Sequence, residues 1–231
     1  MAAELASIVL PVYNQSAHIR EVIEGYIASL QQAPFAVEVL PVINGPRRDN
    51  SLEICHDLES SFPCVRTLCI EESGWGRAVR FGLSQARGDL LCYTNCARTT
   101  SRDLLLALIY GSIHPDSAIK ANRKIREKAS RRLGSLLYNL ECRALFDLPY
   151  WDINGTPKVF SRTLSRLLEL SRDDDLIDLE FNIICRRENY PVIEIPILSS
   201  RRYSGKSTTS LRSAVRMYWG AWRLHRTLAA K

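Results

Sequence analysis

The chain has 231 residues, of which 46% are hydrophobic and 24% charged, with a formal net charge of +6. This composition is typical of a globular protein and excludes a disordered tail, a collagen-like fibre and a coiled coil. The mild positive charge is compatible with phosphates, nucleic acid or an anionic membrane surface as partners.

No apolar run reaches the roughly 18–20 residues that a membrane span needs. The first residues have no basic region and no cleavage signature, so we expect no signal peptide. The seven cysteines are odd in number and lie mostly in apolar runs. Because of this odd number and these apolar surroundings, we expect a reduced, cytoplasmic protein. The cysteines also lack the spacing of a zinc site.

The first half of the chain alternates strand and helix patterns. Apolar residues at 3-and-4 spacing predict a helix over 19–30, for example, directly after a β-rich run. Such alternation favours a mainly parallel sheet with helices on both faces. The expected strands are 7–13, 35–43, 65–70, 89–94 and 117–121, and the expected helices are 19–30, 51–60, 74–86 and 102–110.

The second half is more helical. Its pattern predicts helices over 126–146, 176–187 and 211–229, a loop and strand over 151–160, a strand over 191–198, and a basic loop over 201–210. We find no internal repeat and no long linker. The expected fold is therefore a single α/β domain over 1–231, with a first half (1–121) of alternating strands and helices and a more helical second half (122–231).

Several sequence motifs resemble those of the inverting family-2 glycosyltransferases of GT-A fold, especially the branch that contains dolichyl-phosphate mannose synthase. In chain order they are IVLPVYN (8–14), VINGPRRDNS (42–51), GWGRAVRFGLSQARGDLL (74–91), DINGTPKVF (152–160), DLEFNIICRRENYPVIEIPI (178–197) and RRYSGKS (201–207). The resemblance implies a nucleotide-sugar donor and often a polyprenyl phosphate acceptor. It also implies that residues 1–121 form the nucleotide-sugar-binding half and residues 122–231 the acceptor-side half.

The resemblance implies that the first motifs form the donor site. A general rule agrees with this, since ligands of parallel sheets bind beyond the carboxyl ends of the strands. The family holds the base near the first strand end, although Asn14 could equally be a plain cap of a strand-to-helix turn. The glycine-basic segment offers a helix N-terminus to an anion. The expected donor residues are Pro11, Tyr13, Asn14, Asn44, Gly74, Gly76, Arg77, Arg80, Asn95 and Arg98.

The sequence departs from the family after the fourth strand. The family places Asp-x-Asp there to hold Mg²⁺ or Mn²⁺, whereas this chain has Asn95-Cys96-Ala97. A hard divalent cation prefers charged oxygen ligands. Either arginines such as Arg98 neutralise the diphosphate without metal, or the chemistry is lost or altered. We expect no tightly held metal. The acids at 173–175 would form a substitute cation site or a solvated helix start.

The resemblance also implies the catalytic and acceptor residues. Asp152 lies in the acceptor-side loop, and Asp178 and Glu180 match an acidic helix start. An alcohol acceptor needs a general base, whereas a phosphate acceptor is already anionic and mainly needs positioning. The basic loop is expected to bind phosphate through Arg201, Arg202, Gly205, Lys206 and Ser207.

The last predicted helix carries two stripes. Leu211, Val215, Tyr218 and Trp222 form an apolar stripe, and Arg212, Arg216, Arg223 and Arg226 form a basic one beside it. This pattern fits peripheral contact with an anionic membrane, or a helix packed on the core with its arginines in water. No recognised nucleic-acid module is present, so we do not expect a nucleic-acid partner.

Together these patterns predict a glycosyltransferase that passes a sugar, with inversion, to a polyprenyl phosphate or another acceptor. The alternatives are a non-catalytic homologue that binds or regulates a partner, and a GT-A enzyme with an altered transfer reaction. The missing acidic pair is the main support for both.

Overall fold

The computed structural model describes residues 3–123, 129–197 and 211–229. In chain order the elements are β1 (Leu5–Val12), α1 (Ile19–Leu30), β2 (Ala36–Asn44), α2 (Ser51–Ser61), β3 (Leu68–Ile70), α3 (Trp75–Gln85), β4 (Leu90–Tyr93), α4 (Ser101–Ile113), β5 (Ala118–Arg123), α5 (Ala129–Phe146), β6 (Lys158–Ser161), the 3₁₀ helix η1 (Ser165–Glu169), α6 (Ile177–Arg187), β7 (Val192–Ile197) and α7 (Leu211–Ala229).

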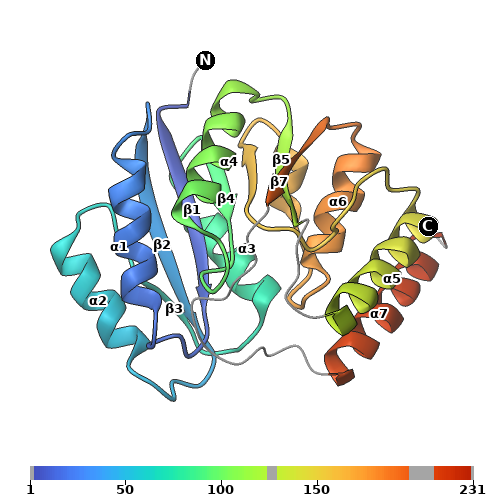
Figure 1. Ribbon diagram of the computed structural model, residues 1–231, viewed down its shortest axis with the longest axis horizontal. Helices are drawn as coiled ribbons and strands as arrows, with labels where there is room; N and C mark the ends of the chain where they lie inside the picture. Colours follow the sequence, from blue (N-terminus) through green and yellow to red (C-terminus); the bar gives the residue numbers. More distant parts are fainter. Residues whose placement is uncertain (1–2, 124–128, 198–210, 230–231) are drawn as a thin grey trace.

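Seven strands form one sheet in the order β3-β2-β1-β4-β6-β5-β7 (Figure 1). Every pairing is parallel except those of β6, which runs antiparallel to both β4 and β5. The predicted α/β fold with a mainly parallel sheet is therefore confirmed. Because only β6 is reversed, the start of β6 lies at the same edge as the carboxyl ends of β4 and β5.

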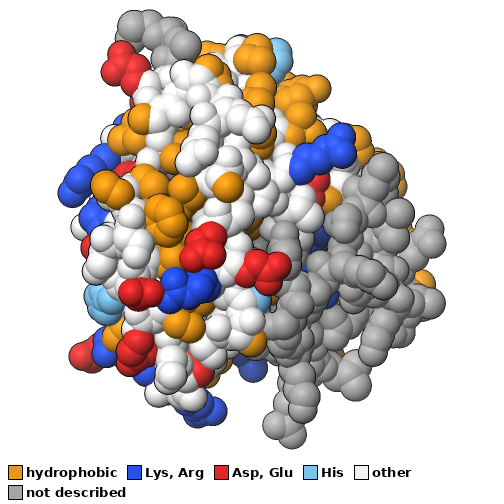
Figure 2. Space-filling view, turned by 60° about the vertical axis from the view of Figure 1, so that its left-hand side comes forward, with side chains coloured by type: hydrophobic (Ala, Val, Ile, Leu, Met, Phe, Trp, Pro, Cys, Tyr) orange, Lys and Arg blue, Asp and Glu red, His pale blue; other side chains and the backbone are white. Residues whose placement is uncertain are grey.

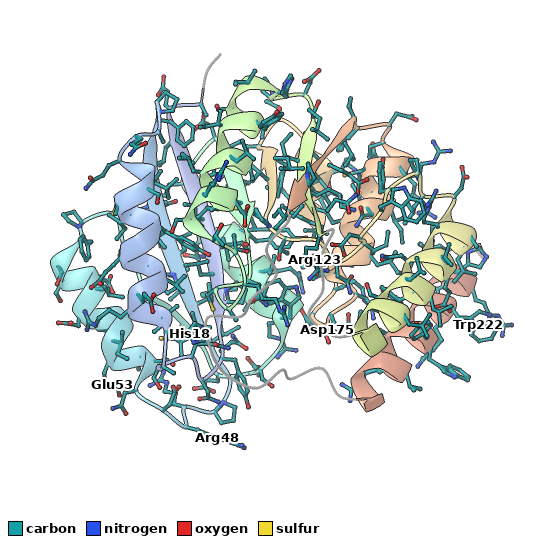
Figure 3. All side chains as sticks on the ribbon, viewed as in Figure 1. His18, Arg48, Glu53, Arg123, Asp175 and Trp222 are labelled. Atoms are coloured by element: carbon teal, nitrogen blue, oxygen red, sulfur yellow. The ribbon has the colours of Figure 1, made fainter. Side chains whose placement is uncertain are left out.

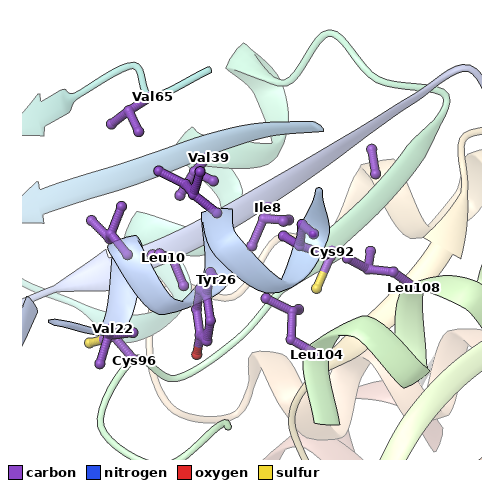
Figure 4. Close-up of a cluster of buried hydrophobic side chains, with 14 of the residues drawn as sticks. Ile8, Leu10, Val22, Tyr26, Val39, Val65, Cys92, Cys96, Leu104 and Leu108 are labelled. Atoms are coloured by element: carbon purple, nitrogen blue, oxygen red, sulfur yellow. The ribbon is translucent and has the colours of Figure 1, made fainter. Parts of the chain in front are cut away.

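Helices cover both faces of the sheet. Ile8 and Leu10 of β1 pack against α1, α2 and α4, whereas Val9 faces α3 and α6. Such two-sided burial explains why β1 is almost continuously apolar. Figure 4 shows the first of these clusters, in which Tyr26 of α1 contributes the largest ring.

A third apolar cluster joins α5 and α7 to α6. It includes Tyr138 and Cys142 of α5, Leu179 of α6 and Ala221 of α7. Figure 1 shows α5 and α7 side by side, on the far side of the molecule from α1 and α2. Among the described residues, no helix is both long and apolar enough to cross a membrane.

The sequence analysis missed some details. The expected strand over 65–70 is shorter, because Val65 makes only an isolated bridge to Val39 before β3 begins at Leu68. The backbone of Thr67 instead donates to the Glu59 carboxylate. The helical turn η1 was not predicted, since five residues carry too little periodicity to reveal it.

A glycine in α3 tests this packing. A Cβ at Gly82 would lie 2.3 Å from Cγ1 of Val9, inside the sheet–helix interface. We expect Gly82→Ala to lower the free energy of unfolding by about 1–2 kcal/mol, because the clash exceeds the gain in helix propensity. Gly134→Ala in α5 is the control: a Cβ there meets nothing within 4 Å. It should stabilise by up to about 1 kcal/mol in the same urea titration. Equal effects of the two variants would contradict this packing.

Candidate functional site

Three polar side chains lie in one row at the carboxyl edge of the sheet. Tyr93 at the end of β4 is in register with Lys158 at the start of β6, and Lys158 is adjacent to Lys120 of β5 across the next pairing. Residues directly opposite each other on neighbouring strands project to the same face. Both lysines are completely buried, so two ammonium groups share one interior site.

Acidic side chains from two further elements compensate these lysines. The Lys158 ammonium pairs with Asp178 at the start of α6, and the Tyr93 hydroxyl donates to the same carboxylate at 3.1 Å. The Lys120 ammonium lies 3.4 Å from Oε1 of Glu194 in β7 and donates to Oδ1 of Asn182 at 3.0 Å. The predicted site residue Asp178 is thus part of a buried ionic network.

Burial changes the acidity of this row. Desolvation, together with repulsion from Lys158, lowers the pKa of Lys120 to about 8, although Glu194 and Asp152 oppose the shift. Desolvation also lowers the pKa of Lys158 against the attraction of Asp178. Burial and the Asp178 charge raise the pKa of the Tyr93 hydroxyl, so the phenol stays a hydrogen-bond donor.

Asp152 lies beside this network and is held by Arg123, the last residue of β5. The guanidinium Nε and Nη2 each donate to one carboxylate oxygen at 2.7 Å, and the Arg123 backbone N–H donates at 2.9 Å. Asp152 is buried. This two-pronged geometry fixes the orientation as well as the charge of the carboxylate. In Figure 3, Arg123 lies near the centre of the molecule.

The backbone of Asp152 has a φ of +46°, which a residue with a side chain adopts infrequently. The two buried lysines hold the peptide groups around it: Lys120 donates to the carbonyl of Trp151 at 2.8 Å, and Lys158 to that of Ile153 at 3.2 Å. Asn182 also donates to the Ile153 carbonyl, at 3.0 Å. Such restraint is how a protein maintains an unfavourable backbone conformation at a functional position.

The same loop packs closely against β5. A Cβ at Gly155 would lie only 1.8 Å from the carbonyl oxygen of Ala121, so any side chain would push the loop away from the strand. The Gly155 backbone N–H donates to the Asp152 carbonyl at 2.8 Å. The glycine of this segment therefore sets the position of Asp152 relative to Arg123.

Glu180 serves a different part of the structure. Its carboxylate accepts the backbone N–H groups of Ser171 and Arg172, both at 2.9 Å, and the Ser171 hydroxyl. It thereby closes the turn before α6. The three candidate carboxylates thus have separate partners, and those of Glu180 belong to a loop rather than to the buried row.

The same turn covers the start of α3. The backbone N–H of Arg77 donates to the Asp173 carbonyl at 3.0 Å, and Cβ atoms at Gly74 and Gly76 would lie 2.7 and 2.3 Å from carbonyl oxygens of this loop. The glycines thus allow the 172–174 backbone to approach the helix N-terminus. At the helix start, where the sequence predicts an anion site, a loop carbonyl accepts the Arg77 N–H in this structure.

Asp173 also binds the two basic side chains of α3. Its carboxylate pairs with Arg80 and, at 3.2 Å, with Arg77. Partial burial opposes ionisation, but these hydrogen bonds outweigh it and lower the pKa of Asp173. The predicted phosphate-binding arginines thus already share a carboxylate. Asp173 is therefore an ion-pair partner rather than a member of a cation site.

The remaining donor-side residues surround a small pocket where β1 and β2 end. Asn14, with a φ of +50°, lines it together with Asn44, Gly45 and Arg47. Oδ1 of Asn14 accepts the Arg48 backbone N–H at 3.0 Å. The buried Asn44 amide donates to the Val12 carbonyl at 2.9 Å, and its oxygen accepts the Gly74 N–H at 3.3 Å. Asn44 therefore ties β1, β2 and α3 together.

Tyr13 and Pro11 border the same region. The Tyr13 ring lies beside Gly45, where an added Cβ would approach it to 3.1 Å. The Pro11 carbonyl is 3.8 Å from the Cys96 sulfur. Of the two predicted base-side residues, Tyr13 therefore lies next to the turn that forms the pocket, and Pro11 lies next to the segment that follows β4.

The segment after β4 does not fit a divalent cation. Oδ1 of Asn95 accepts the Ala97 backbone N–H at 2.9 Å, and Arg98 follows in the same turn, its N–H donating to the Asn95 carbonyl at 3.3 Å. Cys96 and Ala97 are buried. Within residues 3–123, 129–197 and 211–229, no three His, Cys, Asp or Glu side chains gather as a metal-ligand set.

The predicted phosphate residues Arg201, Arg202, Gly205, Lys206 and Ser207 lie outside the described residues. The sequence analysis in turn did not select Tyr93, Lys120, Arg123, Lys158 or Asn182. The available signal was a lysine beside apolar residues in each of two short strands, AIKANR and KVFS. A charged side chain inside a central strand is rarely buried without a partner.

The charged cluster lies at the carboxyl edge of a mostly parallel sheet, which is where open α/β sheets generally bind their ligands. The sequence profile described as Glycosyl transferase family 2 matches residues 7–145, more than half of the chain. The chain therefore belongs to glycosyl transferase family 2.

Similar proteins include undecaprenyl-phosphate 4-deoxy-4-formamido-L-arabinose transferases. That of Sodalis glossinidius is 23% identical over 227 residues, covering 95% of this chain and 67% of the relative. That of Pseudomonas paraeruginosa is 24% identical over 213 residues, covering 90% and 61%. The chain thus spans about two thirds of the length of these relatives.

Solved structures show the same fold at low identity. Glucosyl-3-phosphoglycerate synthase from Mycobacterium tuberculosis, in complex with Mn²⁺, UDP and its product, has a TM-score of 0.76 and 14% identity, covering 96% of this chain and 80% of that one. Mannosyl-3-phosphoglycerate synthase from Rubrobacter xylanophilus has a TM-score of 0.67 and 16% identity, covering 99% and 74%. These likenesses establish the GT-A architecture.

The buried ion pair can be tested by removing one or both charges. Lys158→Met leaves Asp178 buried without its cation, so we expect a loss of about 3–5 kcal/mol in the free energy of unfolding. The double variant Lys158→Met/Asp178→Asn should recover more than half of that loss. As a control, Asp147→Asn breaks an exposed pair with Arg186 and should cost less than about 1 kcal/mol. Additive single and double effects would show that the pair is not coupled.

Proposed function

We propose that this protein transfers a sugar, with inversion, from a nucleotide-sugar donor to a polyprenyl phosphate. Membership of glycosyl transferase family 2 supports the donor class. The undecaprenyl-phosphate sugar transferases among its relatives support the acceptor class. The reaction would take place where that lipid is available, on the cytoplasmic side of a membrane.

The hydrogen bonds and ion pairs that hold the candidate carboxylates support this proposal. Both oxygens of Asp152 accept hydrogen bonds from Arg123, Asp178 pairs with a buried lysine, and Glu180 closes a turn. Carboxylates held in this way are poor general bases, which an alcohol acceptor would need. A phosphate acceptor already carries the attacking oxygen as an anion and requires alignment instead. The site therefore suits a phosphate acceptor.

Asp152 and Arg123 would form the positioning centre of this reaction. Asp152 keeps the guanidinium in one orientation, and Arg123 is partly accessible, with 20% of its side chain exposed. Guanidinium groups bind phosphate oxygens in the same planar geometry that they use for carboxylates. The loop from Arg201 to Ser207 would add further cations to the acceptor or the donor diphosphate.

The donor would occupy the half formed by 1–121, and the acceptor the half formed by 122–231. The base would lie against the turn that contains Gly45, beside Asn14 and the Tyr13 ring and near Pro11, while the amide of Asn44 supports that turn. Arg77, Arg80 and Arg98 would face the diphosphate. To reach it, Arg77 and Arg80 would exchange the Asp173 carboxylate for phosphate oxygens.

We further propose that donor binding depends little on a divalent metal. Related folds were solved with Mn²⁺ or Mg²⁺ beside UDP. In this chain the corresponding turn offers the Asn95 amide, already bonded to its own backbone, and the methyl group of Ala97. Neither matches the charged oxygen ligands that such cations prefer.

A non-catalytic homologue is the second candidate. The Asn95–Ala97 turn and the pairing of Arg77 and Arg80 with Asp173 favour it, because both reduce the groups available to a diphosphate. The two candidates predict different binding behaviour.

Calorimetric titration separates them. UDP, GDP and CMP and their sugar conjugates would each be added with Mn²⁺ or with EDTA. We expect one base to bind, and EDTA to weaken its binding by less than about threefold, because the carboxylate pair that would hold the cation is missing. Loss of binding in EDTA would overturn metal independence. Absence of binding under both conditions would favour the non-catalytic homologue.

Substitution at the positioning centre tests the acceptor side. Asp152→Asn keeps the shape and tolerates a positive φ, but it removes the negative charge and one of the two acceptor oxygens that hold the Arg123 guanidinium. We expect kcat to fall about 10- to 100-fold through lost alignment, with donor affinity unchanged. Asp57→Asn, which affects an exposed pair with Arg20 on the opposite side of the sheet, is the matched control. An unchanged kcat in Asp152→Asn would remove Asp152 from the mechanism.

A further inference from the structure

Lys120 and Glu194 hold both backbone polar groups of Trp151, the residue before Asp152. The Lys120 ammonium donates to the Trp151 carbonyl at 2.8 Å, and Oε2 of Glu194 accepts the Trp151 N–H at 3.1 Å. The two side chains come from neighbouring strands, because Lys120 of β5 is in register with Glu194 of β7. One ion pair between adjacent strands therefore fixes the backbone at the point where the Asp152 loop begins.

The ammonium group of Lys120 matches the oxygen atoms around it in number. An ammonium has three N–H donors and no acceptor. Besides the Trp151 carbonyl, it donates to Oδ1 of Asn182 at 3.0 Å and lies 3.4 Å from Oε1 of Glu194. This last oxygen is buried and has no hydrogen bond within the described part of the chain, so its charge depends on the ammonium. A neutral amine would offer two N–H groups and a lone pair to the same three oxygens.

The loop transmits this restraint to the Asp152 carboxylate. The Trp151 carbonyl belongs to the same planar peptide group as the Asp152 N–H, so a shift of that carbonyl turns the backbone of Asp152. The carboxylate accepts two hydrogen bonds of 2.7 Å from the Arg123 guanidinium, and such paired bonds are specific in geometry. Strand β5 thus supplies both Lys120, which holds the loop, and Arg123, which binds the carboxylate.

The surroundings of Lys120 are closed to solvent. On the face of the molecule shown in Figure 2, lysine and arginine side chains reach the surface, whereas no part of Lys120 is exposed. On the opposite face of β5, Ile119 packs against the apolar residues of α4. The titratable groups that face Lys120 or its neighbour Lys158 come from β6, β7, α6 and the loop before β6, and they are Lys158, Glu194, Asp178, Cys185, Tyr150 and Asp152.

Two of these groups stay neutral where Lys120 titrates. Burial raises the pKa of Tyr150 and that of Cys185 to about 12. Desolvation and the Lys158 charge lower the pKa of Lys120 from 10.5 to about 8, and Glu194 opposes this shift. Because the pKa of Lys120 is lower in the folded chain, loss of this proton favours the folded state. A fall in activity above about pH 8 would therefore reflect altered alignment and not unfolding.

We propose that Lys120 and Glu194 are a positioning pair for Asp152 and Arg123, and that the ammonium form of Lys120 keeps this centre aligned. Neither side chain of the pair would touch the substrates. The inference rests on the proposed function, in which Asp152 and Arg123 align the acceptor phosphate. Deprotonation of Lys120 would loosen the Trp151 carbonyl and slow the transfer while donor affinity stays the same.

An NMR titration of the Arg123 side chain tests the pair without any substrate. The Nε–H of Arg123 donates to Asp152, so its ¹⁵N-correlated signal, assigned with Arg123→Lys, should be protected from exchange. We expect this signal to shift with a midpoint near pH 8. Glu194→Gln keeps an acceptor for the Trp151 N–H but removes the charge that raises the pKa of Lys120, so the midpoint should fall by about one pH unit. A midpoint that is the same in both chains would overturn the pair.

Kinetics test the effect on transfer, with undecaprenyl phosphate and the sugar nucleotide that calorimetry selects. We expect Lys120→Met to lower kcat about 10-fold or more with donor affinity unchanged, and Glu194→Gln to move the alkaline limb of kcat to lower pH. Ile23→Ala is the matched control, because it removes buried volume from α1 on the other face of the sheet. It should lower Tm but leave kcat and its pH profile as they are. An unchanged kcat in Lys120→Met, or an equal loss in Ile23→Ala, would contradict the positioning role.

The positioning pair and the proposed function fail separately. An Arg123 signal that follows Lys120, in a chain that transfers no sugar, would overturn the proposed function and leave the pair intact. Sugar transfer whose pH profile is the same in the unmodified chain and in Glu194→Gln would overturn the pair alone. Glu194→Gln keeps this comparison decisive even where Lys120→Met fails to fold, since it preserves the shape of the side chain and its hydrogen bond to Trp151.

Discussion

Two buried ammonium groups on adjacent strands impose the main constraint on this structure. Lys120 and Lys158 are opposite each other across β5 and β6, and neither side chain reaches solvent. Like charges so placed repel, and each buried ion costs several kcal/mol unless it is paired. The sheet edge is therefore stable only if Asp178 of α6 and Glu194 of β7 stay in place. The contact of α6 with β6 through Asp178, and the pairing of β7 with β5 beside Glu194, meet this requirement.

The same lysines also shape the loop that contains Asp152. Each donates to a carbonyl beside that residue, so the charges that require compensation also restrain an infrequent backbone conformation. A neutral side chain would remove the repulsion and the restraint together. We infer that the buried charges persist because they position Asp152 and Arg123, since an apolar pair of similar volume would stabilise the sheet edge at least as well.

The sequence predicted the fold well because its signals were periodic. The strand and helix patterns are confirmed along most of the described chain, as in α1 and α6, and the six motifs indicated the family that the sequence profile then showed. The site was harder to predict. Glycine spacing suggested an anion site at α3, but a carbonyl from the distant residue Asp173 occupies the helix start. Contacts between residues so far apart leave no periodic trace in one sequence.

Charge at the carboxyl edge limits where the substrates' phosphates can bind. In the buried network, Lys120, Lys158 and Arg123 are matched by Asp178, Glu194 and Asp152, so this part of the described structure has no surplus positive charge. A donor diphosphate and an acceptor phosphate would therefore need cations from elsewhere. Arg77 and Arg80 share Asp173 and offer some. The segment from Arg201 to Lys206, with three more, follows β7 directly in the chain. Under the proposed metal-independent binding of the donor, arginine and lysine of that segment would supply the charge that a divalent ion supplies in the solved structures with Mn²⁺ or Mg²⁺.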